Sequence, residues 1–160
     1  MTGITSPEDI CNLALDYQGE GLHIKSLEAQ DELSRACRRE YDAARRECLA
    51  GRAWSFAAAD AELHGGDGEV TSHHLPADCV RLLRVKAPGV YKTVGRTLYC
   101  EGACVGIRYV RDEADVRRMP SHFVRALATL LASRLPMSGA DALTRKERFL
   151  RQYHQQLKDT

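Results

Sequence analysis

Apolar residues recur every three or four positions near the start of the chain, which is the spacing of one face of an α-helix. The first such set is Ile10, Leu13, Ala14 and Tyr17. Ser6 is a typical N-cap, Pro7 suits the first helical position, and Asp9 completes a capping box. Gly19 suits the helix end. The pattern therefore predicts a first helix between Ser6 and Gly19.

A second helical pattern runs from about Leu27 or Asp31 to Leu49 and is expected to stop at Gly51. Its apolar stripe is Leu33, Cys37, Tyr41, Ala44 and Cys48. The other faces carry closely spaced acidic and basic side chains. Trp54, the single tryptophan, follows this helix and is expected to be buried and to lock the helix into the core.

Residues 57–116 change in character, because short β-type runs replace the helical spacing. The expected strands are 80–85, 90–94, 96–100 and 103–110. Gly95 and the pair Glu101 and Gly102 separate three of these runs and are typical of hairpin turns. These features predict one small antiparallel sheet inserted between helices.

Helical spacing returns after Pro120 and Ser121. The apolar positions of this third helix include Phe123, Leu127, Leu130 and Leu131. A break at 136–139 precedes a last helix at about 140–157. We therefore expect an α+β, mainly helical fold: a bundle of about four helices with a small β-sheet insertion and a C-terminal docking helix. It is expected to form a single domain, 1–160, with a helical core at about 6–56 and 120–157.

The composition is that of an ordinary globular protein, with 44% hydrophobic and 28% charged residues. No apolar run approaches the roughly 20 residues that a membrane span needs, and the first residues lack the pattern of a signal peptide. We expect synthesis in the cytoplasm and no membrane partner. The six cysteines include no C-x-x-C pair, so buried thiols are expected rather than a metal site or disulfides.

Positive charge is concentrated at the end of the chain. Residues 117–160 carry nine basic and three acidic side chains, whereas the rest is net negative. This imbalance suggests an acidic partner surface, although a solvated helix face has the same composition. The candidate docking residues are Arg145, Lys146, Arg148, Phe149, Leu150, Arg151, Tyr153 and Leu157. Phe149, Tyr153 and Leu157 are expected to be exposed along one edge; alternatively, this helix packs on its own bundle.

Residue types that carry catalysis are present without a catalytic arrangement. His64, His73 and His74 flank a glycine-rich loop, but adjacent histidines in an extended segment point to opposite sides. Cys100 and Cys104 are separated by a turn and suit a hairpin better than a ligand pair. Paired carboxylates fall at helix starts or in loops. We therefore expect no catalytic residue, no cofactor and no metal; a virion-associated peptidoglycan hydrolase is the weaker alternative.

Arginines on the second helix raise the alternative of a DNA-binding or packaging-associated protein. They are Arg35, Arg38, Arg39, Arg45 and Arg46, and Arg52 follows just after the helix. Acidic residues alternate with them, as Asp42 does with Arg46, and pairs four residues apart suit a solvent-exposed helix. Sequence-specific DNA recognition is therefore not expected.

Taken in order, several segments resemble the head-to-tail adaptors of short-tailed phages, also called tail tubular protein A or tail accessory factor. The segment from Ile10 to Leu15, Ile-Cys-Asn-Leu-Ala-Leu, is similar to the family's Ile-x-Asn-x-Ala-Leu pattern. The other matching segments are Ile24 to Leu27, Cys37 to Leu49, Trp54 to Ala57, Leu75 to Leu82, Arg108 to Val110 and Pro120 to Phe123. The chain departs from typical members in a short glycine-rich loop at 64–69 and a short tail after Leu157.

The resemblance implies a structural, non-enzymatic protein of the virion neck or tail, assembled in the host cytoplasm. Family members are monomers in solution that add to the portal protein as a ring of twelve subunits. The ring extends the channel through which DNA leaves, without reading its sequence, and receives the tail nozzle or knob protein. The C-terminal segment is the part that reaches the portal, which matches the basic candidate residues above.

Overall fold

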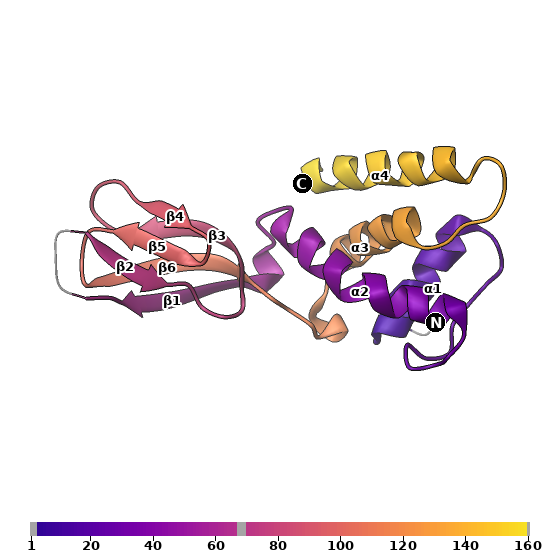
Figure 1. Ribbon diagram of the computed structural model, residues 1–160, viewed down its shortest axis with the longest axis horizontal. Helices are drawn as coiled ribbons and strands as arrows, with labels where there is room; N and C mark the ends of the chain where they lie inside the picture. The colour runs from indigo at the N-terminus through magenta and orange to yellow at the C-terminus, as the bar shows by residue number, and fades with distance from the viewer. Residues whose placement is uncertain (1–2, 67–69, 160) are drawn as a thin grey trace. The chain divides into compact units, whose positions relative to one another are not determined.

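The computed structural model describes residues 3–66 and 70–159, and these form two compact units. A helical unit contains residues 3–52 and 114–159, and a β unit contains the residues from 53 to 113. The helices in the described residues are α1 (Pro7–Gln18), α2 (Glu32–Ala50), α3 (Ser121–Arg134) and α4 (Ala142–Lys158) (Figure 1). None of them combines the length and hydropathy that a helix needs to cross a membrane. Residues 67–69 of the glycine-rich loop lie outside the described part.

The predicted boundaries of α1 are confirmed, together with their cause. The Ser6 hydroxyl accepts a hydrogen bond from the Asp9 N–H at 3.2 Å, and the Asp9 carboxylate accepts one from the Ser6 N–H at 3.1 Å. This is the expected capping box. Gly19 ends the helix with a φ of +76°, which a glycine adopts without strain. The N-cap of α2 is Asp31, whose carboxylate accepts from the Ser34 N–H at 3.0 Å.

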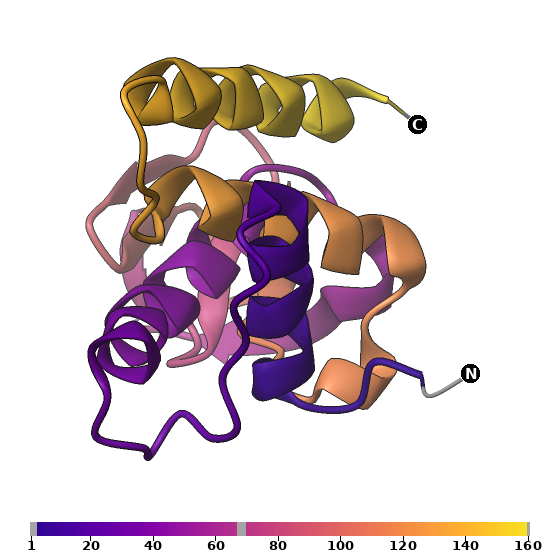
Figure 2. The ribbon, with the colours of Figure 1, turned by 90° about the vertical axis from the view of Figure 1, so that its right-hand side faces the viewer.

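Helix α3 is the centre of the helical unit, and α1, α2 and α4 each pack against it (Figure 2). Its buried residues lie on every side of the helix and are Phe123, Val124, Ala126, Leu127, Ala128, Thr129, Leu130, Leu131 and Ala132. A helix that is apolar all round is stable only when neighbours cover it. Cys11, Cys37 and Cys48 on α1 and α2 are buried, as the apolar stripes predict.

The β unit consists of two three-stranded antiparallel sheets in its described residues. Sheet A has the order β1 (Ala58–His64), β6 (Cys104–Arg111), β3 (Cys79–Lys86). Sheet B has the order β2 (Thr71–His74), β5 (Thr97–Cys100), β4 (Lys92–Val94). Side chains from both sheets share one core, formed by Leu63, Cys79, Leu98, Cys100, Val105, Ile107 and Tyr109. Alternate residues of each strand therefore face outward.

The expectation of a mainly helical bundle with one small sheet is wrong. The β unit has two sheets that share a core of their own. The fold is therefore α+β, with a helical unit and a β unit, and not a helical bundle with a small insertion. Two strands, β1 and β2, were not predicted, because their sequences are rich in alanine, acidic residues and histidine. The expectation of a single domain across residues 1–160 stays a prediction.

One of the two predicted hairpins is confirmed. Gly95 has a φ of +58° and lies in the turn that joins β4 to β5, where Val94 pairs with Thr97. Glu101 and Gly102, in contrast, do not form a hairpin turn. They join β5 of sheet B to β6 of sheet A, so the chain crosses from one sheet to the other. Trp54 is buried, as predicted, with 2% of its surface exposed.

Candidate functional site

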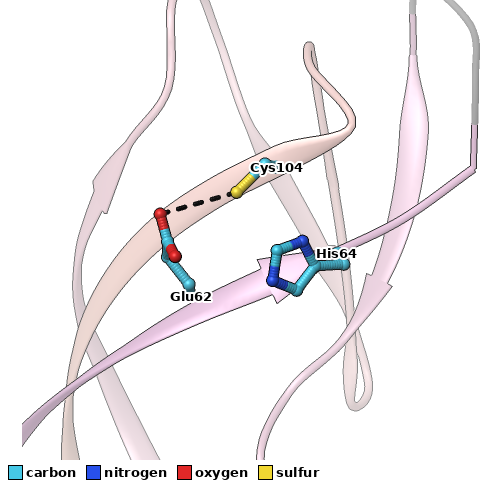
Figure 3. Close-up of side chains that lie close together, drawn as sticks. All are labelled: Glu62, His64 and Cys104. Carbon is cyan, nitrogen blue, oxygen red and sulfur yellow. Dashed lines mark hydrogen bonds between the residues drawn. The ribbon is translucent and has the colours of Figure 1, made fainter.

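Three side chains with metal-binding atoms meet on the outer face of sheet A. Glu62 and His64 are two residues apart on β1 and therefore point to the same face. Cys104, on β6, is the direct cross-strand partner of His64. The ligand atoms of all three residues lie within 4.8 Å of one another (Figure 3). We call these three residues the Glu62 cluster; all are exposed to solvent.

The Cys104 thiol donates a hydrogen bond to Oε1 of Glu62 over 3.6 Å. Desolvation and the negative charge of Glu62 raise the pKa of the Cys104 thiol. The thiol is therefore protonated near neutral pH and aimed at the carboxylate. A divalent cation at this point would replace the thiol proton, because the thiolate is the form of cysteine that binds metals.

The surroundings of the Glu62 cluster leave space above the sheet. The cross-strand partner of Glu62 is Gly106, which has no side chain. A shallow hollow of about 480 Å³ opens there, lined by Asp60, Ala61, Glu62, Lys86, Gly106 and Ile107. Asp60 is engaged by Arg108 at 2.9 Å. The hollow therefore gives water access to Glu62 on the solvent side of the sheet.

Two of these three residues, His64 and Cys104, were considered from the sequence, but each was grouped with residues that do not lie beside it in the cluster. His64 was grouped with His73 and His74, yet His73 is buried on β2 and His74 is exposed, so the two do point to opposite sides as expected. The ring Nε2 of His73 lies 2.8 Å from Oγ1 of Thr71. Cys104 was grouped with Cys100, which belongs to the other sheet. Glu62 was missed, although the alternation Glu-x-His on an extended segment is its signal.

The predicted docking residues on α4 divide between two faces of that helix. Tyr153 is buried, and Arg145, Lys146, Phe149 and Leu157 are half-buried. The expectation that Tyr153 is exposed is wrong, because α4 packs on α3 and the Tyr153 side chain hydrogen-bonds to the Cys48 thiol. The outward face carries Leu143, Arg148, Leu150 and Arg151. Whether this face binds a portal stays a prediction.

Arg145 has a structural role that its sequence position did not suggest. Its guanidinium donates to the main-chain carbonyl oxygen of Gln18, the last residue of α1. Cations stabilise a helix at this end, where carbonyl groups lack partners. The side chain is therefore engaged within the helical unit.

A second exposed group of apolar side chains lies around β4, which is an edge strand of sheet B. Val90 is 90% exposed and Val94 is 55% exposed, and Tyr91 and Tyr99 are also exposed. Val94 and Tyr99 lie on the same outer face, because Val94 pairs with Thr97 and Lys92 pairs with Tyr99. We call Val90, Tyr91, Val94 and Tyr99 the β4 patch. An open strand edge beside apolar side chains is a typical protein-binding feature.

A groove of about 540 Å³ on the helical unit is mainly apolar and is lined by Ile4, Leu13, Tyr17, Met119, Ser121, Val124 and Arg125. The described residues that line it include no carboxylate or histidine, the usual groups for acid–base catalysis. Comparison with known proteins gives no further guide: no protein-family model matches the sequence, and no curated protein shows significant similarity to it.

Proposed function

We propose that this protein is a structural head-to-tail adaptor of a phage virion, which binds the portal ring and offers an attachment site for the tail. The proposal begins from the family resemblance of the sequence. The observation that best supports it is the presence of two separate exposed surfaces suited to protein partners, one on each unit. An adaptor needs two such surfaces, because it joins two different proteins.

The first surface is the outward face of α4, which joins leucine and arginine side chains. Leu143 is 71% exposed and Leu150 is 40% exposed, and Arg148 and Arg151 are exposed on the same helix. Apolar side chains beside positive charge suit a partner surface that combines acidic residues with an apolar pocket. We assign portal binding to this face. Electrostatic attraction would set mainly the association rate, and burial of the leucines would supply affinity.

The second surface is the β4 patch, which is apolar and carries a free strand edge. Its strand has three residues, all exposed. The four side chains of the patch carry no charge, so it differs in chemistry from the basic face of α4. We assign contact with the tail protein, or with the next subunit of the ring, to this patch. The ring would form only on the portal, where neighbouring subunits are brought together.

The test uses the full chain and portal rings from the same phage. Arg148→Glu with Arg151→Glu should reduce binding to the rings and make it more sensitive to salt, while circular dichroism stays unchanged. Arg35→Glu with Arg39→Glu, on the exposed side of α2, is the matched charge-reversal control and should bind normally. The double variant Val90→Lys and Val94→Lys should still attach to the portal rings as single subunits. It should, however, fail to complete the adaptor ring or to attach the tail.

Two outcomes would overturn the proposal. One is that the parent chain does not decorate portal rings in sedimentation or electron microscopy. The other is that the chain binds bulk double-stranded DNA tightly and with a steep salt dependence, and that the α4 reversals abolish this binding. The second outcome would favour the DNA-binding or packaging-associated alternative.

A further inference from the structure

We propose that Glu62, His64 and Cys104 form a zinc-binding site on the outer face of sheet A, with water as the fourth ligand. The inference goes beyond the adaptor function and does not depend on it. It rests on the convergence of three different donor atoms from two paired strands. A carboxylate oxygen, an imidazole nitrogen and a thiolate sulfur are the three ligand types that protein zinc sites use.

The backbone holds the three residues in place before any ion binds. β1 and β6 pair without a register shift from Ala58 with Val110 to His64 with Cys104. The ladder continues past the cluster, because the Gly65 N–H donates to the Ala103 carbonyl oxygen at 2.7 Å. Ligand atoms around tetrahedral zinc lie roughly 3.3–3.7 Å apart, given metal–ligand distances of about 2.0–2.3 Å. Side-chain rotations can close the present spacing of up to 4.8 Å without moving the strands.

The donor set also selects among cations. Mg²⁺ and Ca²⁺ prefer oxygen ligands and larger coordination numbers, so one carboxylate does not suit them. Thiolate and imidazole favour zinc and other late transition metals. Zn²⁺ is usually bound by four ligands, and three of them can come from the protein when a water molecule fills the fourth position. The hollow above Gly106 lets that water reach the ion.

Binding is a proton exchange with no redox step. The Cys104 S–H bond breaks, its proton leaves to solvent, and the sulfur lone pair forms the bond to Zn²⁺. The Glu62 carboxylate, which accepts the thiol hydrogen at 3.6 Å in the absence of metal, turns to the ion instead. One proton is released for each ion bound, so the affinity should increase with pH. The bound ion would link the end of β1 to the start of β6.

The six cysteines give the experiment an internal reporter, because Cys104 is exposed and the other five are buried. In native protein kept reduced by a phosphine, iodoacetamide should alkylate Cys104 rapidly and the other thiols slowly. Micromolar Zn²⁺ should slow alkylation of Cys104 roughly tenfold or more, whereas Mg²⁺ and Ca²⁺ should have no effect. Co²⁺ should give a sulfur-to-metal absorption band that Zn²⁺ removes and that Cys104→Ser lacks.

Two ligand variants and two matched controls complete the test. His64→Asn and Glu62→Gln should each weaken zinc protection roughly tenfold or more. The controls are His74→Asn, an exposed histidine on sheet B, and Asp60→Asn, an exposed acid on the same face of β1; both should keep full protection. If Zn²⁺ does not protect Cys104 in the parent, or protects both ligand variants as well as the parent, the site does not exist. Circular dichroism checks that each variant is folded.

Discussion

The side-chain amide of Gln18 lies 3.1 Å from the main-chain carbonyl oxygen of Leu135, so the last residue of α1 caps the C-terminal end of α3. The same Nε2 atom also lies 3.1 Å from the carbonyl oxygen of Ala132. Carbonyl groups at the end of a helix have no partner within that helix. Gln18 is buried, so water does not replace it. This contact joins segments that are more than a hundred residues apart in the sequence.

Replacing Gln18 by leucine should destabilise the helical unit. The change removes both hydrogen bonds and leaves two buried carbonyl groups without a donor, at a cost of about 1–3 kcal/mol. Urea unfolding followed by circular dichroism measures the difference in free energy. Gln152→Leu, at an exposed position of α4, is the control and should change stability by less than about 0.5 kcal/mol. Equal effects from the two variants would contradict the capping role of Gln18.

Tyr153→Ala should show that α4 belongs to the core of the helical unit. The ring is buried and its hydroxyl meets the Cys48 thiol, whose pKa burial raises to about 12. Truncating a buried aromatic side chain costs about 3–5 kcal/mol. Leu150→Ala, on the exposed face of the same helix, should cost less than about 1 kcal/mol. If the two variants unfold at the same denaturant concentration, α4 is not packed as described.

The packing of α4 also changes how a docking role must be tested. Removing residues 140–160 would expose the apolar side of α3 that α4 covers, so loss of portal binding would follow from misfolding alone. Charge reversal of Arg145 could also reduce portal binding by destabilising the fold, because that side chain caps α1. Arg148 and Arg151 are better positions for the test, since both are exposed and neither change should disturb the fold.

A pH dependence follows from the cap of α1. The hydrogen bond from the Thr5 N–H, at 2.9 Å, is the main cause that lowers the pKa of the Asp9 carboxyl from 3.8. Because the folded pKa lies below the unfolded one, the Asp9 carboxylate stabilises the fold above pH 3.8, and this contribution disappears as the pH falls through the folded pKa. Asp9→Asn should therefore lower the melting temperature at neutral pH, and this difference should shrink in acid.

The partner residue of this capping box supplies the control for the pH experiment. Ser6→Ala should cost about 1 kcal/mol, and its effect should persist in acid, because a hydroxyl group does not titrate there. Differential scanning calorimetry at neutral pH and at a pH below the lowered folded pKa of Asp9 separates the two behaviours. A loss from Asp9→Asn that is the same at both pH values would contradict the proposed role of the carboxylate.

The helices were predictable from the sequence because their signals are local. Ser6, Asp9 and Gly19 mark the two ends of α1 within the helix and its flanking residues. The strand β1 lacked such signals: Ala58–His64 has low β-propensity, and the alternation of Ala61, Glu62 and Leu63 was overlooked. Its stability comes from pairing with β6, some forty residues later, which the local pattern does not reveal. Propensity is a weak guide where pairing and burial decide.

The Glu62 cluster was not predicted from the sequence for a related reason. His64 and Cys104 become neighbours only through the register of β1 and β6, and β1 was not recognised as a strand. Sequence proximity instead suggested pairs such as Cys100 and Cys104, which the crossing between sheets separates. On α4 the sequence pattern predicted Phe149, Tyr153 and Leu157 along one exposed edge, but Tyr153 is buried and the other two are half-buried.

The last prediction tests the two faces of the β4–β5 hairpin. Thr93 pairs with Leu98 and Val94 pairs with Thr97, so adjacent residues point in opposite directions. Leu98 is fully buried in the core between the sheets, and Val94 is 55% exposed. Leu98→Ala should therefore cost about 2–5 kcal/mol, while Val94→Ala should change stability by less than about 0.5 kcal/mol. Denaturant unfolding monitored in the β-sheet signal measures both values. If Val94→Ala proved as destabilising as Leu98→Ala, the register would be wrong by one residue and Val94 would not belong to an exposed patch, because a slip of one position exchanges the two faces of a strand.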